Sequence, residues 1–211
     1  MSSKKTIQTI AAITKSASPG PTPAFTSVHI CRAIMAIGDQ GPIGRIELSR
    51  RLNLGEGAIR TIIKHLTARN FVDPAKEGCV LTQRGIALYK SLRSKLSEVR
   101  LVNARQLSLD RASAGVLIRN AGAVVRRGIE QRDAAIRAGA TGGCTLVYRN
   151  GKFVMPAGER DESYLASSDV LFEDLRRLFG PREGDVITIV SASSRGLAEH
   201  CAMAAALTLL G

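Results

Sequence analysis

The chain has 211 residues and a mass of 22.5 kDa, long enough for one domain with a large core or for two small ones. Its composition, 45% apolar and 23% charged, is typical of globular proteins and argues against disorder of the whole chain. No apolar run approaches the roughly 18 residues that a membrane span requires. We therefore expect a soluble, cytoplasmic protein.

The charge is unevenly distributed along the chain. The net charge of +12 favours a polyanionic partner, either nucleic acid or an acidic membrane surface. Residues 1–100 contain 16 Lys and Arg against 6 Asp and Glu, whereas residues 101–211 contain 14 against 12. This asymmetry predicts a polyanion-binding N-terminal module joined to a C-terminal module with another task.

The four cysteines are far apart, and none lies in a Cys-x-x-Cys or Cys/His cluster. Such spacing favours neither a disulfide framework nor a zinc site. We expect free thiols, no metal and no cofactor.

Residues 1–23 are expected to form a flexible basic arm. They contain Lys4, Lys5 and Lys15, a weak apolar patch of isoleucines, and the helix-breaking run SASPGPTP. This pattern predicts a transient helix followed by a non-helical linker.

The next segment, 24–100, begins with three predicted helices. Apolar residues at helical spacing predict the first over 25–37. Leu48 and Leu52 mark the buried side of the second, and a tight turn leads into the third, over about 56–69. The third helix has one buried face, formed by Ile59, Ile62, Ile63 and Leu66.

Two short strands follow, over 71–73 and 79–82, joined by a turn that contains Lys76. A fourth helix over about 84–99 carries an apolar stripe that either closes the domain or packs against a second copy in a dimer. The stripe consists of Ile86, Leu88, Leu92, Leu96 and Val99. With the two strands as the wing, this order of elements is that of a winged helix-turn-helix domain.

A helix that enters the major groove of DNA must bury its apolar face and offer side chains that reach phosphates and base edges. The helix over 56–69 fits, because Arg60 and Lys64 lie one turn apart opposite the buried isoleucines. The preceding helix and the wing supply backbone contacts. The predicted DNA-binding residues are Arg45, Ser49, Arg50, Gly57, Ala58, Arg60, Thr61, Lys64, His65 and Lys76. Taken singly, each exposed cation is equally well explained as a solvated charge.

The run LNLGEGAIRTIIKHL followed by LTQRG resembles the winged-helix part of a small archaeal family classed as transcriptional regulators. The stretch IEQRDAAIRAGATGGCTLVYRNGKFVMP, the segment GDVITIV and the Ala-rich last helix resemble the C-terminal domain of the same family, whose function is not established. The resemblance covers most of the chain from about Phe25. It implies a fold and a regulatory role but no catalytic residues.

Residues 101–211 predict a small α+β sheet domain, so the fold class is α+β with an N-terminal winged helix-turn-helix domain. The predicted strands are 114–118, 144–148, 152–155 and 185–191, and the predicted helices are 129–137, 170–179 and 195–210. Asn-Gly at 150–151 predicts a hairpin.

Two places in this domain could bind a small anionic effector. One is the run SASSRG, where a strand leads into a helix N-terminus with Ser193, Ser194 and Arg195. The other combines Arg132 and Arg137 with the nearby TGG. The competing and simpler explanations are an ordinary helix cap and a tight turn with surface ion pairs.

No catalytic constellation is visible, since His200 and Cys201 are adjacent in a helix and their side chains diverge. The leading hypothesis is a homodimeric regulator that binds double-stranded DNA, with residues 101–211 serving dimerisation or effector sensing. One alternative is a winged-helix protein for RNA binding or protein assembly. The weakest is an enzyme with a regulatory winged helix.

Overall fold

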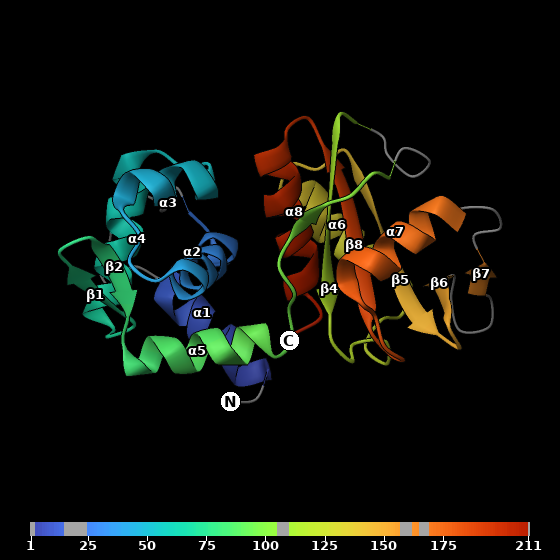
Figure 1. Cartoon of the computed structure of the whole chain (residues 1–211), viewed down its shortest axis with the longest axis horizontal. Helices are drawn as coiled ribbons and strands as arrows, with labels where there is room; N and C mark the ends of the chain where they lie inside the picture. Colours follow the sequence, from blue (N-terminus) through green and yellow to red (C-terminus); the bar gives the residue numbers. More distant parts are fainter. Residues whose placement is uncertain (1–2, 15–24, 105–109, 157–161, 165–168, 211) are drawn as a thin grey trace. The chain divides into compact units, whose positions relative to one another are not determined.

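The computed structural model describes residues 3–14, 25–104, 110–156, 162–164 and 169–210. The chain divides into two compact units, Met1–Ser94 and Lys95–Gly211 (Figure 1). The first unit is mainly helical and the second is built on a sheet. The expected α+β fold, with a helical domain followed by a sheet domain, is therefore confirmed.

The N-terminal unit contains helices and one two-stranded hairpin. In chain order the elements are α1 (Ser3–Thr14), α2 (Ser27–Gln40), α3 (Arg45–Leu52), α4 (Glu56–Ala68), β1 (Val72–Ala75), β2 (Gly78–Leu81) and α5 (Gln83–Arg93). From α2 onward this is the element order of a winged helix-turn-helix domain, and α1 adds a helix in front.

The turn between α3 and α4 is stabilised by local contacts. Asn53 ends α3 in the left-handed conformation, with φ of 53°. The Ser49 hydroxyl donates a hydrogen bond of 2.5 Å to the carbonyl oxygen of Leu54. The predicted buried faces of the two helices are present at Leu48, Leu52, Ile59, Ile62 and Leu66.

The wing is held to the helices by a contact that the sequence did not indicate. Strands β1 and β2 pair from Val72 opposite Leu81 to Ala75 opposite Gly78. Ile43 extends this ladder, since its backbone exchanges hydrogen bonds of 2.9 and 3.1 Å with Cys79. A Cβ at Gly78 would lie 2.4 Å from the Ile43 backbone, so only glycine allows the approach.

The expected flexible arm is wrong for residues 3–14, which form α1 and pack against α2, α4 and α5. Ile10 and Ile13 are fully buried. The Thr6 hydroxyl lies 2.7 Å from the Ser91 hydroxyl of α5. Burial of this face stabilises a helix that is too short to persist alone. The remainder of the predicted arm, over 15–23, lies outside the described residues.

The expected fourth helix, over 84–99, ends early, and the unit boundary lies after Ser94 rather than at residue 100. From Lys95 the backbone pairs with the end of a strand in the second unit. Lys95 accepts a hydrogen bond of 2.7 Å from the Arg119 amide, and Leu96 forms a β-bridge with Ile118. The sheet therefore takes up residues that helical periodicity assigned to α5.

The C-terminal unit contains one six-stranded antiparallel sheet, with strand order β3-β4-β8-β5-β6-β7. The strands are β3 (Arg100–Leu101), β4 (Ala112–Ile118), β5 (Gly142–Arg149), β6 (Lys152–Pro156), β7 (Glu162–Tyr164) and β8 (Val186–Ala192). The last strand in sequence thus lies between β4 and β5. Asn150 and Gly151 both have positive φ, which confirms the predicted hairpin between β5 and β6.

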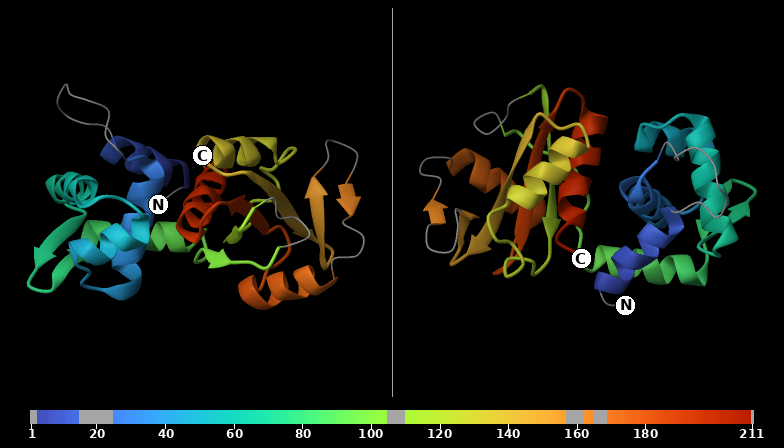
Figure 2. Two further views of the ribbon diagram at one scale, coloured as in Figure 1. Left: turned by 90° about the horizontal axis from the view of Figure 1, so that it is seen from above. Right: turned by 180° about the vertical axis from the view of Figure 1, so that it is seen from behind.

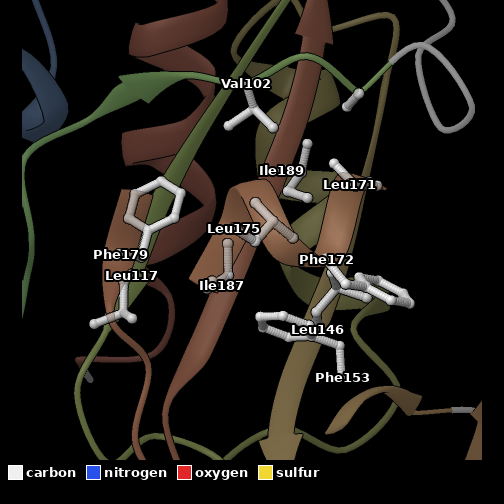
Figure 3. Packing of buried hydrophobic residues seen from close by; sticks show 11 residues of the cluster. Val102, Leu117, Leu146, Phe153, Leu171, Phe172, Leu175, Phe179, Ile187 and Ile189 are labelled. Carbon is white, nitrogen blue, oxygen red and sulfur yellow. The ribbon is translucent and has the colours of Figure 1, made fainter. Parts of the chain in front are cut away.

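Helices cover both faces of this sheet (Figure 2). They are α6 (Ile129–Arg137), α7 (Asp169–Phe179) and α8 (Arg195–Leu207). Large side chains pack between α7 and the sheet, where the Phe153 and Phe172 rings lie 5.2 Å apart beside Leu175 (Figure 3). On the other face α6 and α8 approach closely, because the contact residues are small, mainly alanines.

Candidate nucleic-acid interface

The outer face of α4 carries two exposed cations. Ile59, Ile62 and Leu66 are buried, so Arg60 and Lys64 are turned to solvent one helical turn apart. Among the described residues, neither forms an ion pair or a side-chain hydrogen bond. Both charges are thus available to an external anion.

Two further cations, from neighbouring elements, form no ion pair among the described residues. Arg45 begins α3 and Lys76 lies at the tip of the hairpin, and both are exposed. Burial raises the pKa of the Cys79 thiol, while the positive charge of Arg45 acts in the opposite direction. Arg45 also follows Ile43, whose backbone pairs with Cys79 of the wing, by only two residues.

Three other predicted residues have side chains engaged within the chain. Arg50 pairs with Glu47, and the Ser49 hydroxyl closes the α3–α4 turn. The Thr61 hydroxyl donates to the Gly57 carbonyl at 3.0 Å. These contacts favour structural roles for the three side chains.

His65 is directed toward α1 rather than toward solvent. Its Nδ1 lies 2.9 Å from the Ile13 carbonyl oxygen. Its ring makes an edge-to-face contact with Phe25, with ring centroids 5.5 Å apart. The geometry favours a role in holding α1 in place over a role in reading bases.

The N-terminal ends of α3 and α4 have no side-chain caps. Gly44 and Gly55 occupy the N-cap positions, and Gly57 and the partly exposed Ala58 lie in the first turn of α4. A Cβ at any of these glycines would meet no atom within 4 Å. Nothing inside the chain requires glycine there, so the open backbone permits close approach by another molecule.

Ile46 is an exposed residue that sequence reasoning missed. It lies in the first turn of α3 beside Arg45, and 75% of its surface is accessible. In the sequence, Ile46 lies off the helix face that Leu48 and Leu52 form, and this position indicates an exposed side chain. An exposed isoleucine next to Arg45 offers apolar contact to another molecule.

The candidate effector residues come from two chain connections that are adjacent at one end of the sheet. The amide of Thr141, between α6 and β5, donates to the Ser191 carbonyl at 2.9 Å. Ser194 caps α8 by accepting from the Leu197 amide at 3.4 Å. This bond is an ordinary N-cap, as the simpler explanation predicted.

Arg137 is the last residue of α6 and lies at this end of the sheet, whereas Arg132 lies more than a turn earlier in the helix. Ser193, Arg195 and both α6 arginines are exposed. The sheet thus brings Arg137 to the same end as 193–195 but leaves Arg132 apart.

The described residues contain no cluster of three or more His, Cys, Asp or Glu side chains that could hold a metal ion. Burial raises the pKa of Cys31 and of Cys144 to about 12, so neither thiol ionises near neutral pH. Cys201 is buried and donates to the Ala138 carbonyl at 3.3 Å. No described helix has both the length and the apolarity that crossing a membrane demands.

Comparison with known proteins finds a similar family for each part of the chain. Residues 36–87 match the model for the PH0730-like N-terminal domain, and residues 109–209 match a domain of unknown function, DUF4443. The fold is similar to that of the hypothetical protein PH0730 from Pyrococcus horikoshii OT3, with a TM-score of 0.70 and 24% identity over 88% of this chain and 92% of that one. No curated protein matches the chain. The N-terminal part of the chain is therefore similar to the PH0730-like N-terminal domain, and the C-terminal part is similar to the DUF4443 domain.

Proposed function

We propose that this protein is a transcriptional regulator that binds double-stranded DNA through its N-terminal unit. The observation that carries the proposal is the outer face of α4, where Arg60 and Lys64 are exposed and unpaired among the described residues. In a winged helix-turn-helix domain this helix enters the major groove. The helix order and the hairpin support that arrangement.

The cations around α4 suit the phosphate backbone on either side of a groove. Arg45 and Lys76 flank the helix from α3 and the wing. Residues 1–94 contain 14 Lys and Arg against 5 Asp and Glu, so the whole unit attracts a polyanion. The open N-terminal end of α4 allows the helix to approach a phosphate closely.

The test is binding of the full chain to a mixed-sequence duplex of about 30 base pairs, long enough for two half-sites one helical turn apart. The variant Arg60→Gln/Lys64→Gln should bind about 10- to 100-fold more weakly than the wild type. The matched control Lys90→Gln/Arg182→Gln removes the same charge at exposed side chains that form no bonds among the described residues, and should bind nearly as the wild type does. Equal losses in both variants would reject α4 as the reading helix.

The same assay addresses the RNA alternative. Structured RNA of similar length should compete weakly, because the deep, narrow major groove of A-form RNA does not admit a helix. Competition as strong as that of duplex DNA would replace the DNA proposal. Sequencing of DNA crosslinked to the protein in cells would then identify the operator and separate a regulator from a general chromatin binder.

We predict that two copies of the protein bind paired half-sites on DNA with two-fold symmetry. The apolar stripe at 86–99 does not supply the dimer surface, because its members Leu88, Leu92 and Leu96 are buried within the chain. A dimer would therefore use another surface. Light scattering at working concentration measures the mass directly.

A further inference from the structure

Helix α6 begins without a side-chain cap. Its N-cap is Gly128, in the left-handed conformation with φ of 74°. The amides of Ile129, Glu130 and Gln131 point out of the helix and have no acceptor within it. Such an end favours an anion, but it defines a binding site only in combination with other groups.

A buried hydroxyl lies against this helix end. Thr145 on β5 is only 4% exposed, and its Oγ1 has no hydrogen-bond partner in the part of the chain that the structure describes. A Cβ on Gly128 would lie 3.3 Å from this oxygen, so the hydroxyl faces the N-cap residue. Thr188, paired with Thr145 across the sheet, directs its own hydroxyl to the Ala202 carbonyl. An unsatisfied buried hydroxyl carries a desolvation cost that a bound group would remove.

The side chain of Gln131, in the first turn of α6, supplies a second unsatisfied atom. Its Nε2 donates to the Thr208 hydroxyl at 2.8 Å, and that hydroxyl donates to the Ala205 carbonyl at 2.7 Å. The Thr208 hydroxyl has a single proton, which it donates to the Ala205 carbonyl, so it can only accept from Gln131. The Gln131 side-chain nitrogen, which donates, must therefore face Thr208. Gln131 Oε1 is consequently fixed as an acceptor, and it is buried without a partner among the described residues.

The surrounding charge favours an anion. Arg126 and Arg127 immediately precede Gly128, and both are exposed without an ion pair among the described residues. Arg132 adds a third cation one turn into α6. Glu130 and Asp133 oppose them in part, which leaves a positive balance at the start of the helix.

We propose that the start of α6 binds a small phosphate group that carries a hydroxyl, either free hydrogen phosphate or a phosphate monoester with a neighbouring hydroxyl. Its anionic oxygens accept from the amides of residues 129–131 and from the Thr145 hydroxyl, and Arg126 and Arg127 balance its charge. Its hydroxyl donates to Gln131 Oε1. Because Thr145 is buried, the segment 126–128 must shift as the phosphate enters.

The test is an amide NMR titration of the full-length chain with inorganic phosphate, without DNA, at constant ionic strength. Signals of residues 126–131 and 145 should shift saturably in the millimolar range. Thr145→Val should weaken binding about tenfold and leave the fold intact, because it replaces an unsatisfied hydroxyl by a methyl group of similar size. Arg127→Gln, at an exposed position, should weaken binding as well.

Two comparisons complete the experiment. Ser194→Ala removes the cap of α8 and should leave phosphate affinity unchanged, which excludes the other helix end. Sulfate cannot donate to Gln131 and should bind about tenfold more weakly than phosphate. Glycerol 3-phosphate distinguishes a monoester from free phosphate by its relative affinity.

No saturable shift, or an unchanged affinity in Thr145→Val, would overturn the proposal and assign the two buried atoms to ordered water. Because no DNA is present, this result is independent of whether α4 binds DNA.

Discussion

At the residue scale, Asp185 shows how one buried carboxylate fixes a sheet. It precedes β8 and is 3% exposed. Its oxygens accept from the Arg119 guanidinium at 2.7 Å, from the Asn120 amide at 2.8 Å and from the Arg182 amide at 2.9 Å. These bonds join the end of β4 to the start of β8, the strand at the centre of the sheet.

We expect Asp185→Ala to lower the free energy of unfolding by about 2–4 kcal/mol, because two backbone amides and a guanidinium lose their acceptor. Asp174→Ala is the control, since it removes a carboxylate whose partner Arg177 is exposed and should cost less than about 1 kcal/mol. Urea unfolding of both variants measures the difference. Similar losses of stability in the two variants would show that Asp185 contributes no more than an exposed ion pair does.

At the element scale, α1 is the clearest departure from the sequence analysis. Its isoleucines gave only a weak apolar patch, and the residues after it contain several helix breakers. The helix breakers do not prevent the preceding segment from forming a helix. The apolar face of α1 is buried only because α4 and α5 pack against it, and these helices are remote in sequence. The contact of His65 with the Ile13 carbonyl has the same origin, because the two residues are remote in sequence.

A pair of substitutions tests whether α1 belongs to the folded unit. Ile10→Ala should destabilise the protein by about 2–4 kcal/mol, since the side chain is fully buried. Ile7→Ala, at a partly exposed position of the same helix, should cost less than about 1 kcal/mol. Thermal unfolding compares them. An unchanged melting temperature for Ile10→Ala would restore the interpretation of a loose arm.

At the scale of the whole molecule, charge is divided between the units. The unit ending at Ser94 carries 14 basic against 5 acidic residues, whereas the unit from Lys95 carries 16 against 13. A polyanion is therefore attracted mainly to the first unit.

This division predicts the salt dependence of DNA binding. If Arg45, Arg60, Lys64 and Lys76 each neutralise a phosphate, the logarithm of affinity should fall with the logarithm of salt with a slope of about −3 to −4 for each protomer. Arg60→Gln/Lys64→Gln should make the slope shallower by about 2. Binding titrations over a range of salt concentrations give both values. An unchanged slope in this variant would place the phosphate contacts elsewhere.

The sequence by itself determined the α+β class, the helix-turn-helix and hairpin order, the turn at Asn150-Gly151 and most helices of the second unit. These features depend on periodicity and turn residues, which act over a few neighbouring positions. It also identified Arg60 and Lys64 as exposed, because the buried face of α4 fixes the opposite one. Only the tertiary structure decided where α5 ends, that α1 packs on the helices, and that β8 lies between β4 and β5. Pairings between distant residues decide all three, as they do for the contact of Thr145 with Gly128, and no local pattern encodes such partners.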